Sequence, residues 1–569
     1  MDGKRHFWPQ LVAVITLFLA AFAVRALGAD YGYFHGDERI NEAAKVLTGD
    51  IVPGQHFYPP LIHYVNAVGL AGLFALGLAQ DWWTGAGDFR SQYFSDPTVF
   101  YVTARLVTAA FGAVMAPLFY LVARRCDLDG WRAWAVGLLG ALFPLAVFMS
   151  HIAKGDVALA TATIAVFWAF LARMDAGRPG RWDIWLGIFA VLVVSFKQSG
   201  VFVLAPLAFG AMGLIGWTEG MRAMGRSLGR ALLAVVLLWP VLNIGILLDF
   251  NNFLAFQKIQ AVMSLRMEAG VWPGFASLGG RALTLVLGLN PVMAAVALIA
   301  PVLLVMPACE VRRKPALLVI WASLMLGTLL MAAMVGPRQP EHLWIANFAG
   351  FLLLAALCLA GLSETVSPLG KAALAAFALG GTLTAAGAGI ALTEALAPPL
   401  WHKTDAYVAQ HLADRRIMSM AESRLPKRME AQAMEIARWA RLAEKYDTPL
   451  PEMAEERLIR ENVPGAVFYI GMPTVLYGLE EVDEDDPDYV AQAHAWPPQK
   501  EEWQLDHWLA QGFDTFVVKD PEFLTSEAAP DLMRAFFRDM GARCTVEARF
   551  DPAKPLFLER PVHIYRCPG

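Results

Sequence analysis

Long apolar segments dominate the first two thirds of the chain and constrain its fold more than any other feature. The 569 residues are 57% hydrophobic and only 17% charged, and the charged residues concentrate after about residue 398. A water-soluble protein has no use for so much apolar surface. The sequence therefore predicts a polytopic α-helical membrane protein with a soluble C-terminal domain. Segments of bilayer length lie at about 8–28, 99–123, 131–150, 155–172, 182–196, 198–217, 229–249, 281–307, 315–335, 341–362 and 370–395.

The segment 60–79 is apolar as well, and whether it crosses the membrane decides the topology. Basic residues near helix ends favour the cytoplasmic side. If 60–79 lies along the outer membrane surface and the N-terminus is cytoplasmic, all the dense basic groups fall inside. If the segment crosses, most of them move outside. We therefore expect about eleven spans and a second surface helix over 36–48. The basic groups are Arg124 with Arg125, Arg173 with Arg178 and Arg181, Arg222 with Arg226 and Arg230, Arg312 with Arg313 and Lys314, and Lys371.

The expected organisation is a membrane domain over 1–397, with an extracytoplasmic loop at 29–98, and an extracytoplasmic domain over 398–569. Charged helical patterns open the second domain, and the strand-like runs GAVFYIGM, FDTFVVKD and VHIYRC follow. This order predicts a small α/β or α+β domain. Cys544 and Cys567 lie on late strand candidates and can pair in an oxidising compartment.

Acidic residues follow the first span and open the fourth, and this topology places both groups on the outer face. Ionisable residues at a membrane boundary are functional hypotheses by default. The simple interpretation is that Asp37 caps a helix, that Glu38 and Asp156 complement helix dipoles, and that Lys154 is a surface partner of Asp156. The alternative is that Asp37 is a general base for an acceptor hydroxyl, with Asp156 as a second acidic group in a cavity at the membrane edge.

Basic residues on the outer face run against the positive-inside trend. Lys197 lies between two apolar runs, and either a snorkelling lysine or a phosphate-binding cation fits that place. Arg338 can grip phosphate through two donors. A metal site of His35, Asp37 and His56 is conceivable, but no spacing typical of metal ligands supports it.

The sequence contains no motif for two other classes of ligand, soluble nucleotides and nucleic acids. There is no P-loop, and no G-x-G-x-x-G motif lies between a strand and a helix. A soluble nucleotide is therefore not the expected energy source. The basic residues are scattered at segment ends, so no nucleic-acid binding is expected. Considered by themselves, Tyr58 and the two prolines that follow it suggest a structural role.

The order of these motifs along about 30–395 is more specific than any single one. The motifs are Asp37-Glu38 after the first span, Tyr58-Pro59-Pro60-Leu61, Ala104-Arg105-Leu106, Ala123-Arg124-Arg125, Asp156, Lys197-Gln198-Ser199-Gly200, and Arg338. Together they resemble the GT-C glycosyltransferases of the protein O-mannosyltransferase and lipid A aminoarabinose transferase type. The family is expected to use a sugar donor on a polyprenyl phosphate.

The resemblance implies a site at the outer membrane face. Asp37 would activate the acceptor hydroxyl, with Glu38 and Asp156 beside it, and attack would invert the anomeric carbon. Lys197, Arg338 and Tyr58 would face the donor phosphate, which is electrostatic stabilisation of the leaving group. The acceptor would be a lipid, a glycan or a protein. The resemblance implies no certain cofactor, with a divalent metal as an alternative, and the expected location is a bacterial inner membrane.

Two positions depart from the family pattern. Tyr58 precedes the proline pair where the family has lysine or histidine, so the phosphate contact of that lysine is missing or is supplied elsewhere. Gln339 follows Arg338 where tyrosine is usual. Two other functions stay open: transfer of an oligosaccharide or polymer between lipid carriers, and transport. A transporter commonly shows internal repeats, and none is visible in this sequence.

Overall fold

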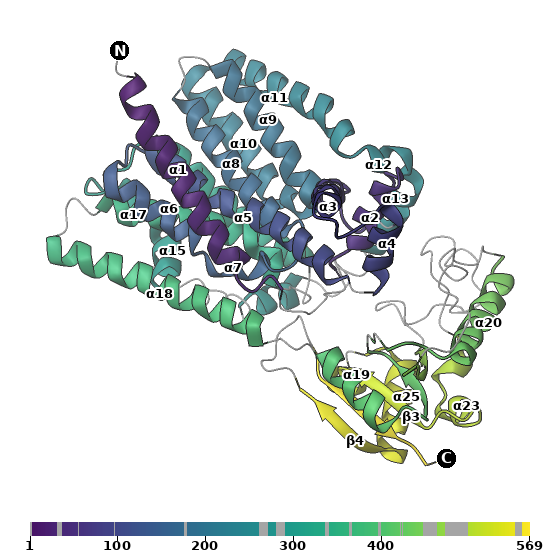
Figure 1. Cartoon of the computed structure of the whole chain (residues 1–569). Coiled ribbons are helices and arrows are strands. Elements are labelled where there is room, and N and C mark those ends of the chain that lie inside the picture. The colour runs from purple at the N-terminus through teal and green to yellow at the C-terminus, as the bar shows by residue number, and fades with distance from the viewer. Residues whose placement is uncertain are drawn as a thin grey trace. The chain divides into compact units, whose positions relative to one another are not determined.

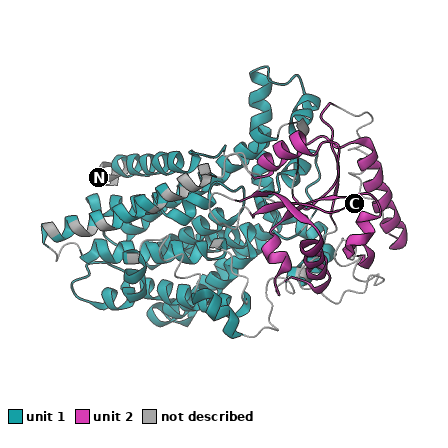
Figure 2. Ribbon diagram, turned by 90° about the horizontal axis from the view of Figure 1, so that it is seen from below, with its two compact units in different colours: residues 1–30, 34–394 teal, residues 31–33, 395–569 magenta. Residues whose placement is uncertain are grey.

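The computed structural model describes two compact units, each with its own kind of secondary structure. One comprises Met1–Asp30 with Phe34–Glu394 and the other takes in Ala395–Gly569 (Figure 2). The first is helical and the second holds a five-stranded sheet. The predicted class, a polytopic helical membrane protein with a small C-terminal domain, is confirmed. The described residues are 3–30, 37–54, 56–95, 97–175, 179–260, 271–279, 291–335, 341–362, 367–395, 400–421, 423, 425–447, 464–472, 499–527, 529–551 and 560–568.

Within the described ranges, nine helices are long and apolar enough to cross a membrane. The protein is therefore an integral membrane protein. The elements that contain these nine segments are α1 (Gly3–Ala26), α3 (Leu61–Ala79), α5 (Thr98–Arg125), α8 (Asp156–Met174), α9 (Pro179–Phe196), α10 (Val201–Glu219), α11 (Met221–Leu242), α16 (Lys314–Val335) and α17 (Ile345–Leu362). The further apolar helices are α15 (Pro291–Val305) and α18 (Pro368–Ala395).

Helix α8 forms the centre of the first unit. Its apolar window is 89% buried, against 6% for that of α11. It packs against α5, α9 and α17. A charged residue at the start of α8 therefore lies inside the protein rather than against lipid, which is where ionisable groups of membrane proteins find partners.

Helix α3 runs across the neighbouring long helices. Figure 1 shows it nearly end-on, whereas α9, α10 and α11 are seen from the side. Length and composition admit α3 as a span, while its direction agrees with the expected position along the membrane surface. The expected helix over 36–48 is α2 (Ile40–Leu47), which packs on α3.

The apolar run expected as a span over 131–150 is not one continuous helix. The chain forms α6 (Gly130–Ala141) and then the short α7 (Pro144–Met149). Phe143 precedes a proline and leaves the helical region, with φ −57° and ψ 110°, because the proline ring clashes with a helical residue before it.

The side chain of Arg25 in α1 satisfies the carbonyls that this break releases. It is fully buried and donates hydrogen bonds to the carbonyl oxygens of Gly140 at 3.1 Å and Ala141 at 2.5 Å. Backbone groups freed inside a membrane protein need such partners.

The second unit holds a mixed sheet of strand order β2-β1-β3-β5-β4. β1 pairs in parallel with β2 and β3, and β5 pairs antiparallel with β3 and β4. The three strand-like runs of the sequence are confirmed as β2, β3 and β5. The strands are β1 (Arg416–Ser419), β2 (Phe468–Gly471), β3 (Thr515–Lys519), β4 (Thr545–Phe550) and β5 (Val562–Arg566).

Helices cover the two faces of this sheet. α20 (Met429–Lys445) and α25 (Asp531–Arg543) contribute to the apolar core on one face, and α19 (Leu400–His411) contributes to that on the other. The shorter elements are α4 (Ala86–Ser95), α12 (Ile244–Leu248), α13 (Phe250–Gln260), α23 (Leu505–Leu509), α24 (Pro521–Thr525) and the 3₁₀ turns η1 (Gln198–Gly200), η4 (Glu341–Trp344) and η5 (Lys500–Trp503). A disulfide joins Cys544 to Cys567, as the sequence allowed.

Candidate functional site

Lys154 stands at the centre of a buried charged cluster in the first unit. It lies between α7 and α8, and only 2% of its side chain is exposed. Its Nζ donates a hydrogen bond to Oδ2 of Asp37 at 2.7 Å and lies 3.9 Å from Oδ2 of Asp156. The interpretation of Lys154 as a surface residue is therefore wrong, because the ammonium group is enclosed between two carboxylates.

Lys197 completes the charge pairing around Asp156. It occupies the extended break between α9 and η1, with φ −162° and ψ 131°. Its Nζ donates to Oδ1 of Asp156 at 2.5 Å, and 12% of the Lys197 side chain is exposed. Asp156 begins α8, as expected, but its carboxylate also pairs with two ammonium groups, those of Lys154 and Lys197.

The ring of Tyr58 lies against both lysines. Its centroid is 5.5 Å from Nζ of Lys154 and 6.0 Å from Nζ of Lys197. Burial raises the pKa of the Tyr58 phenol to about 12, although the charge of Lys154 acts in the opposite direction. The phenol therefore stays protonated near neutral pH and can donate a hydrogen bond.

The two lysines differ in their proton affinity. Burial lowers the pKa of Lys154, but the nearby carboxylates of Asp156 and Asp37 favour the charged form, and the pKa of Lys154 lies above its ordinary value. For Lys197 burial dominates over the attraction of Asp156, and the pKa is lowered. Lys154 is thus the more firmly charged of the two.

His342 also belongs to this cluster. It lies in η4, is half-buried, and interacts electrostatically with Lys197 and Asp156. Neither Lys154 nor His342 was predicted from the sequence as a site residue. A signal existed for Lys154, because it precedes Asp156 by two positions on the face where polar residues converge.

Asp37 is the accessible carboxylate of the cluster. The exposed fraction of its side chain is 35%, against 2% for Asp156. The next helix, α2, begins at Ile40 after Arg39, and no side chain caps it. The capping interpretation of Asp37 is therefore wrong.

Glu38 makes contacts of another kind. Its side chain is fully buried, and its two oxygens accept from Nε of Arg105 at 2.8 Å and from Nη2 at 2.9 Å. The backbone N–H of Ala153 donates to Oε1 of Glu38 at 2.9 Å. The bidentate pair ties the segment of Asp37 to α5, and the bond from Ala153 ties it to the segment of Lys154. Glu38 thus positions the cluster.

His56 contacts Asp249 rather than Asp37. The distance between His56 Nε2 and Asp249 Oδ2 is 2.8 Å. Among the residues that the structure describes, no group of three or more His, Cys, Asp or Glu side chains could hold a metal ion. His35 and Arg338 lie outside the described residues.

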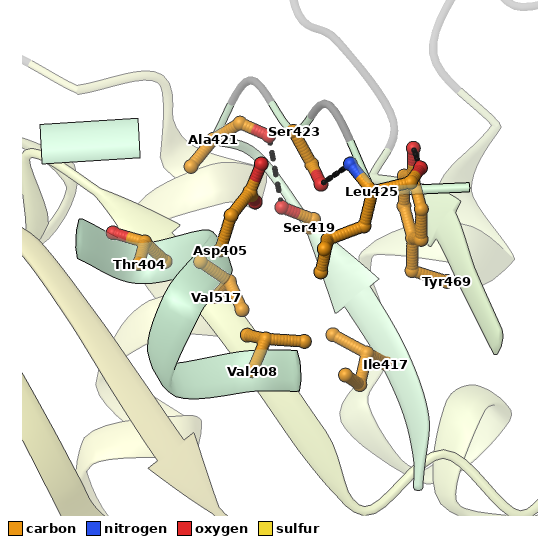
Figure 3. A pocket seen from close by; sticks show the side chains of 10 residues that line it. All are labelled: Thr404, Asp405, Val408, Ile417, Ser419, Ala421, Ser423, Leu425, Tyr469 and Val517. Atoms are coloured by element: carbon orange, nitrogen blue, oxygen red, sulfur yellow. Dashed lines mark hydrogen bonds between the residues drawn. The ribbon is translucent and has the colours of Figure 1, made fainter. Parts of the chain in front are cut away.

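The second unit has a small hollow between α19 and the sheet (Figure 3). Ser419 Oγ donates to the carbonyl of Ala421 at 2.9 Å, and Ser423 Oγ accepts from the N–H of Leu425 at 3.2 Å. The Tyr469 hydroxyl donates to the carbonyl of Leu425 at 3.0 Å. Because these polar groups bond to the protein itself, we assign no ligand to the hollow. The remaining lining residues are Thr404, Asp405, Val408, Ile417 and Val517.

The fold and the cluster define an integral membrane protein with a charge-paired site where the ends of several helices meet. Residues 55–261 match the family model described as dolichyl-phosphate-mannose-protein mannosyltransferase. The matched segment contains Tyr58, Lys154, Asp156 and Lys197, and Asp37 precedes it. The match confirms the resemblance to GT-C glycosyltransferases of the O-mannosyltransferase type.

Three solved structures show a distant likeness. The crystal structure of ArnT from Cupriavidus metallidurans bound to undecaprenyl phosphate has 15% identity, covers 97% of this chain and 97% of that chain, and has a TM-score of 0.45. The oligosaccharyltransferase AglB from Archaeoglobus fulgidus, in complex with an inhibitory peptide and a dolichol-phosphate, has 13% identity, coverages of 92% and 70%, and a TM-score of 0.45. The S. cerevisiae Pmt1-Pmt2 complex bound to the sugar donor has 19% identity, coverages of 41% and 33%, and a TM-score of 0.33. No curated protein sequence matches the chain at a significant level.

Proposed function

We propose that the protein transfers a sugar from a polyprenyl-phosphate carrier to the hydroxyl of a lipid, glycan or protein acceptor. One observation carries the proposal: a partly exposed carboxylate, Asp37, contacts the buried Lys154, and Asp156 links this lysine to Lys197 inside a segment arrangement of the GT-C type. A base beside a cationic phosphate site is what such a transfer needs.

In the proposed reaction Asp37 takes the proton of the acceptor hydroxyl. The acceptor oxygen forms a bond to the anomeric carbon, and the bond from that carbon to the phosphate oxygen breaks. The electron pair leaves with the polyprenyl phosphate, and the anomeric configuration inverts. Lys197 and the protonated phenol of Tyr58 stabilise the charge that develops on the phosphate. Arg338 is a further proposed phosphate ligand.

Lys154 supplies the charge that residue 58 lacks. The resembled family has lysine or histidine before its proline pair, and this chain has Tyr58. Nζ of Lys154 lies 5.5 Å from the centroid of that tyrosine ring. A cation is therefore present beside the position from which the family side chain would act.

Asp156 and Glu38 act through their neighbours in this proposal. The Asp156 side chain is 2% exposed and Lys197 contacts it directly, so it orients the phosphate-facing lysine. Glu38 is closed off by Arg105. Both are positioning residues, and Asp37 alone touches the acceptor.

The proposed location is a bacterial inner membrane, with the N-terminus in the cytoplasm and the C-terminal domain outside it. The basic groups at helix ends support this orientation. The Cys544–Cys567 disulfide supports an oxidising environment for the second domain. The proposed boundary after residue 397 lies close to the division between the compact units at Ala395.

The test is the isosteric variant Asp37→Asn in membranes that contain a labelled polyprenyl-phosphate sugar and an acceptor extract. We expect release of the sugar to fall by about 10²-fold or more, since general base catalysis contributes that much. Asp88→Asn changes an exposed carboxylate outside the cluster and serves as the matched control. Normal transfer by a folded Asp37→Asn protein would refute the base assignment and direct attention to Asp156.

A further inference from the structure

A set of contacts outside the charged cluster joins the loop before α3 to the segment after α11. Asp249 lies between α12 and α13, and its Oδ2 is 2.8 Å from Nε2 of His56. The two residues are 193 positions apart. The side chain of His56 is 1% exposed and that of Asp249 is 30% exposed. The imidazole is therefore enclosed, and its Nε2 contacts the carboxylate of Asp249.

Helix α13 also holds the backbone on either side of this contact. Gln260 Nε2 donates to the carbonyl oxygen of Phe57 at 2.7 Å, and Gln257 Nε2 donates to that of His56 at 3.4 Å. These bonds fix the two peptide units that precede Tyr58. The helix thus contacts the main chain immediately before a residue of the charged cluster.

Aromatic rings of α13 enclose the same peptide. The imidazole of His56 has ring-centroid distances of 5.9 Å to Phe253 and 6.0 Å to Phe256. The Phe57 ring lies 4.9 Å from that of Phe256, edge to face. The guanidinium of Arg39 also lies 5.6 Å from the Phe57 centroid. These contacts therefore restrict the side chains of both His56 and Phe57.

A second anchor lies farther along the loop. The Tyr64 hydroxyl donates to the carbonyl of Ile51 at 2.8 Å and accepts from the N–H of Gly245 at 3.0 Å. A Cβ at Gly245 would lie 2.6 Å from the Ile51 carbonyl oxygen. Glycine there permits the close approach of α12 to the loop.

We propose that His56 and Asp249 are positioning residues for the donor-phosphate site, which they serve through Tyr58. Asp249 fixes His56, and α13 fixes the peptide that follows. Pro59 and Pro60 restrict the chain on the other side, because the pyrrolidine ring sets φ. With both sides of residue 58 fixed, its ring is held against Lys154 and Lys197.

This inference rests on the proposed function, in which Tyr58 and Lys197 face a polyprenyl phosphate. A purely structural contact would affect the stability of the protein and leave the affinity for a phosphate ligand unchanged. A positioning contact changes that affinity, because a misplacement of about 1 Å in a site can cost about 10²-fold.

The experiment measures two properties of the full-length protein in detergent: binding of undecaprenyl phosphate, and hydrogen–deuterium exchange of a peptide covering residues 56–64. The variants are Asp249→Ala, which removes the acceptor, and Asp249→Asn, which keeps an acceptor oxygen for the imidazole N–H. His56→Phe keeps the ring packing and removes the polar contact, so it tests the same idea if Asp249→Ala does not fold. Asp88→Ala is the matched control, an exposed carboxylate that contacts Thr84.

We expect Asp249→Ala and His56→Phe to speed exchange over 56–64 and to weaken undecaprenyl phosphate binding about 10-fold or more. Asp249→Asn is expected to restore most of the affinity, and Asp88→Ala to behave as the wild type. Unchanged exchange in Asp249→Ala would show that the contact does not hold the loop. Faster exchange with unchanged affinity would show that the loop does not serve the phosphate site. Either of these two results overturns the inference and leaves the proposed function standing. If the folded wild type itself does not bind undecaprenyl phosphate, the proposed function fails together with the inference.

Discussion

The ammonium group of Lys154 donates a 2.7 Å hydrogen bond to Asp37, a residue 117 positions earlier in the chain. The carboxylate thereby faces a fixed positive charge on one side and the exterior of the cluster on the other. This pairing orients the proposed base without burying it. The donor and acceptor sides of the proposed site meet at this one contact.

Replacing Lys154 tests the contact between Lys154 and Asp37. We expect Lys154→Met to reduce sugar transfer about 10²-fold, because it removes the charge between Asp37 and Asp156. Lys154→Arg keeps the charge with another geometry, so a smaller loss is expected. Transfer is measured as release of label from a polyprenyl-phosphate sugar. Lys45→Met, which breaks an exposed pair with Asp50, is the control, and equal rates for all three variants would refute the role of Lys154.

The pair of Glu38 and Arg105 is expected to show its value in stability. Both side chains are almost completely buried, so Glu38→Gln leaves a buried guanidinium without its charge partner. Breaking such a pair costs about 3–5 kcal/mol. Thermal unfolding in detergent measures the loss, and Arg105→Met should cost a similar amount. The double variant is expected to lose less than the two single losses together; simple additivity would mean that the pair does not act as a unit.

His151 predicts a pH dependence of stability. Burial lowers the pKa of its imidazole, although hydrogen bonds with the carbonyls of Leu27 and Val147 oppose the shift. As pH falls below about 6.5, the unfolded chain takes up a proton that the folded protein resists. Stability is therefore present above that pH and is lost as pH falls toward the folded-state pKa.

The measurement is the unfolding temperature between pH 7 and pH 5. It should fall with pH in the wild type and fall less in His151→Gln, whose amide does not titrate. His402→Gln replaces an exposed histidine and should leave the slope as it is. A slope unaffected by His151→Gln would assign the pH dependence to other groups.

The disulfide gives a test of both compartment and stability. Alkylation of the denatured protein without reductant should modify the three free cysteines, Cys126, Cys309 and Cys358. Alkylation after reduction should modify all 5. With a sequence separation of 23 between Cys544 and Cys567, loss of the bond is expected to cost the second unit about 3 kcal/mol. Five modified cysteines without reductant would contradict the proposed extracytoplasmic location.

Hydropathy by itself predicted most of the fold. A run of bilayer length is a local property, and α5, α8 and α17 match the expected runs. The exception at 131–150 arises at Phe143, where the following proline interrupts the helix inside a largely apolar run. Strand patterns were local as well, so β2, β3 and β5 could be read directly from the alternation of residues.

The sequence alone determined the class of protein, because apolar length is a property of neighbouring residues, and its helix-end charges predicted a membrane face for the charged residues. The tertiary structure decided which charges meet. Asp37 lies with Lys154, Glu38 with Arg105, and His56 with Asp249. The two adjacent acids thus have different surroundings, because Asp37 is partly exposed and Glu38 is enclosed. Ion-pair choice depends on which helix ends pack together across 67 to 193 positions, and no local pattern of the chain carries that information.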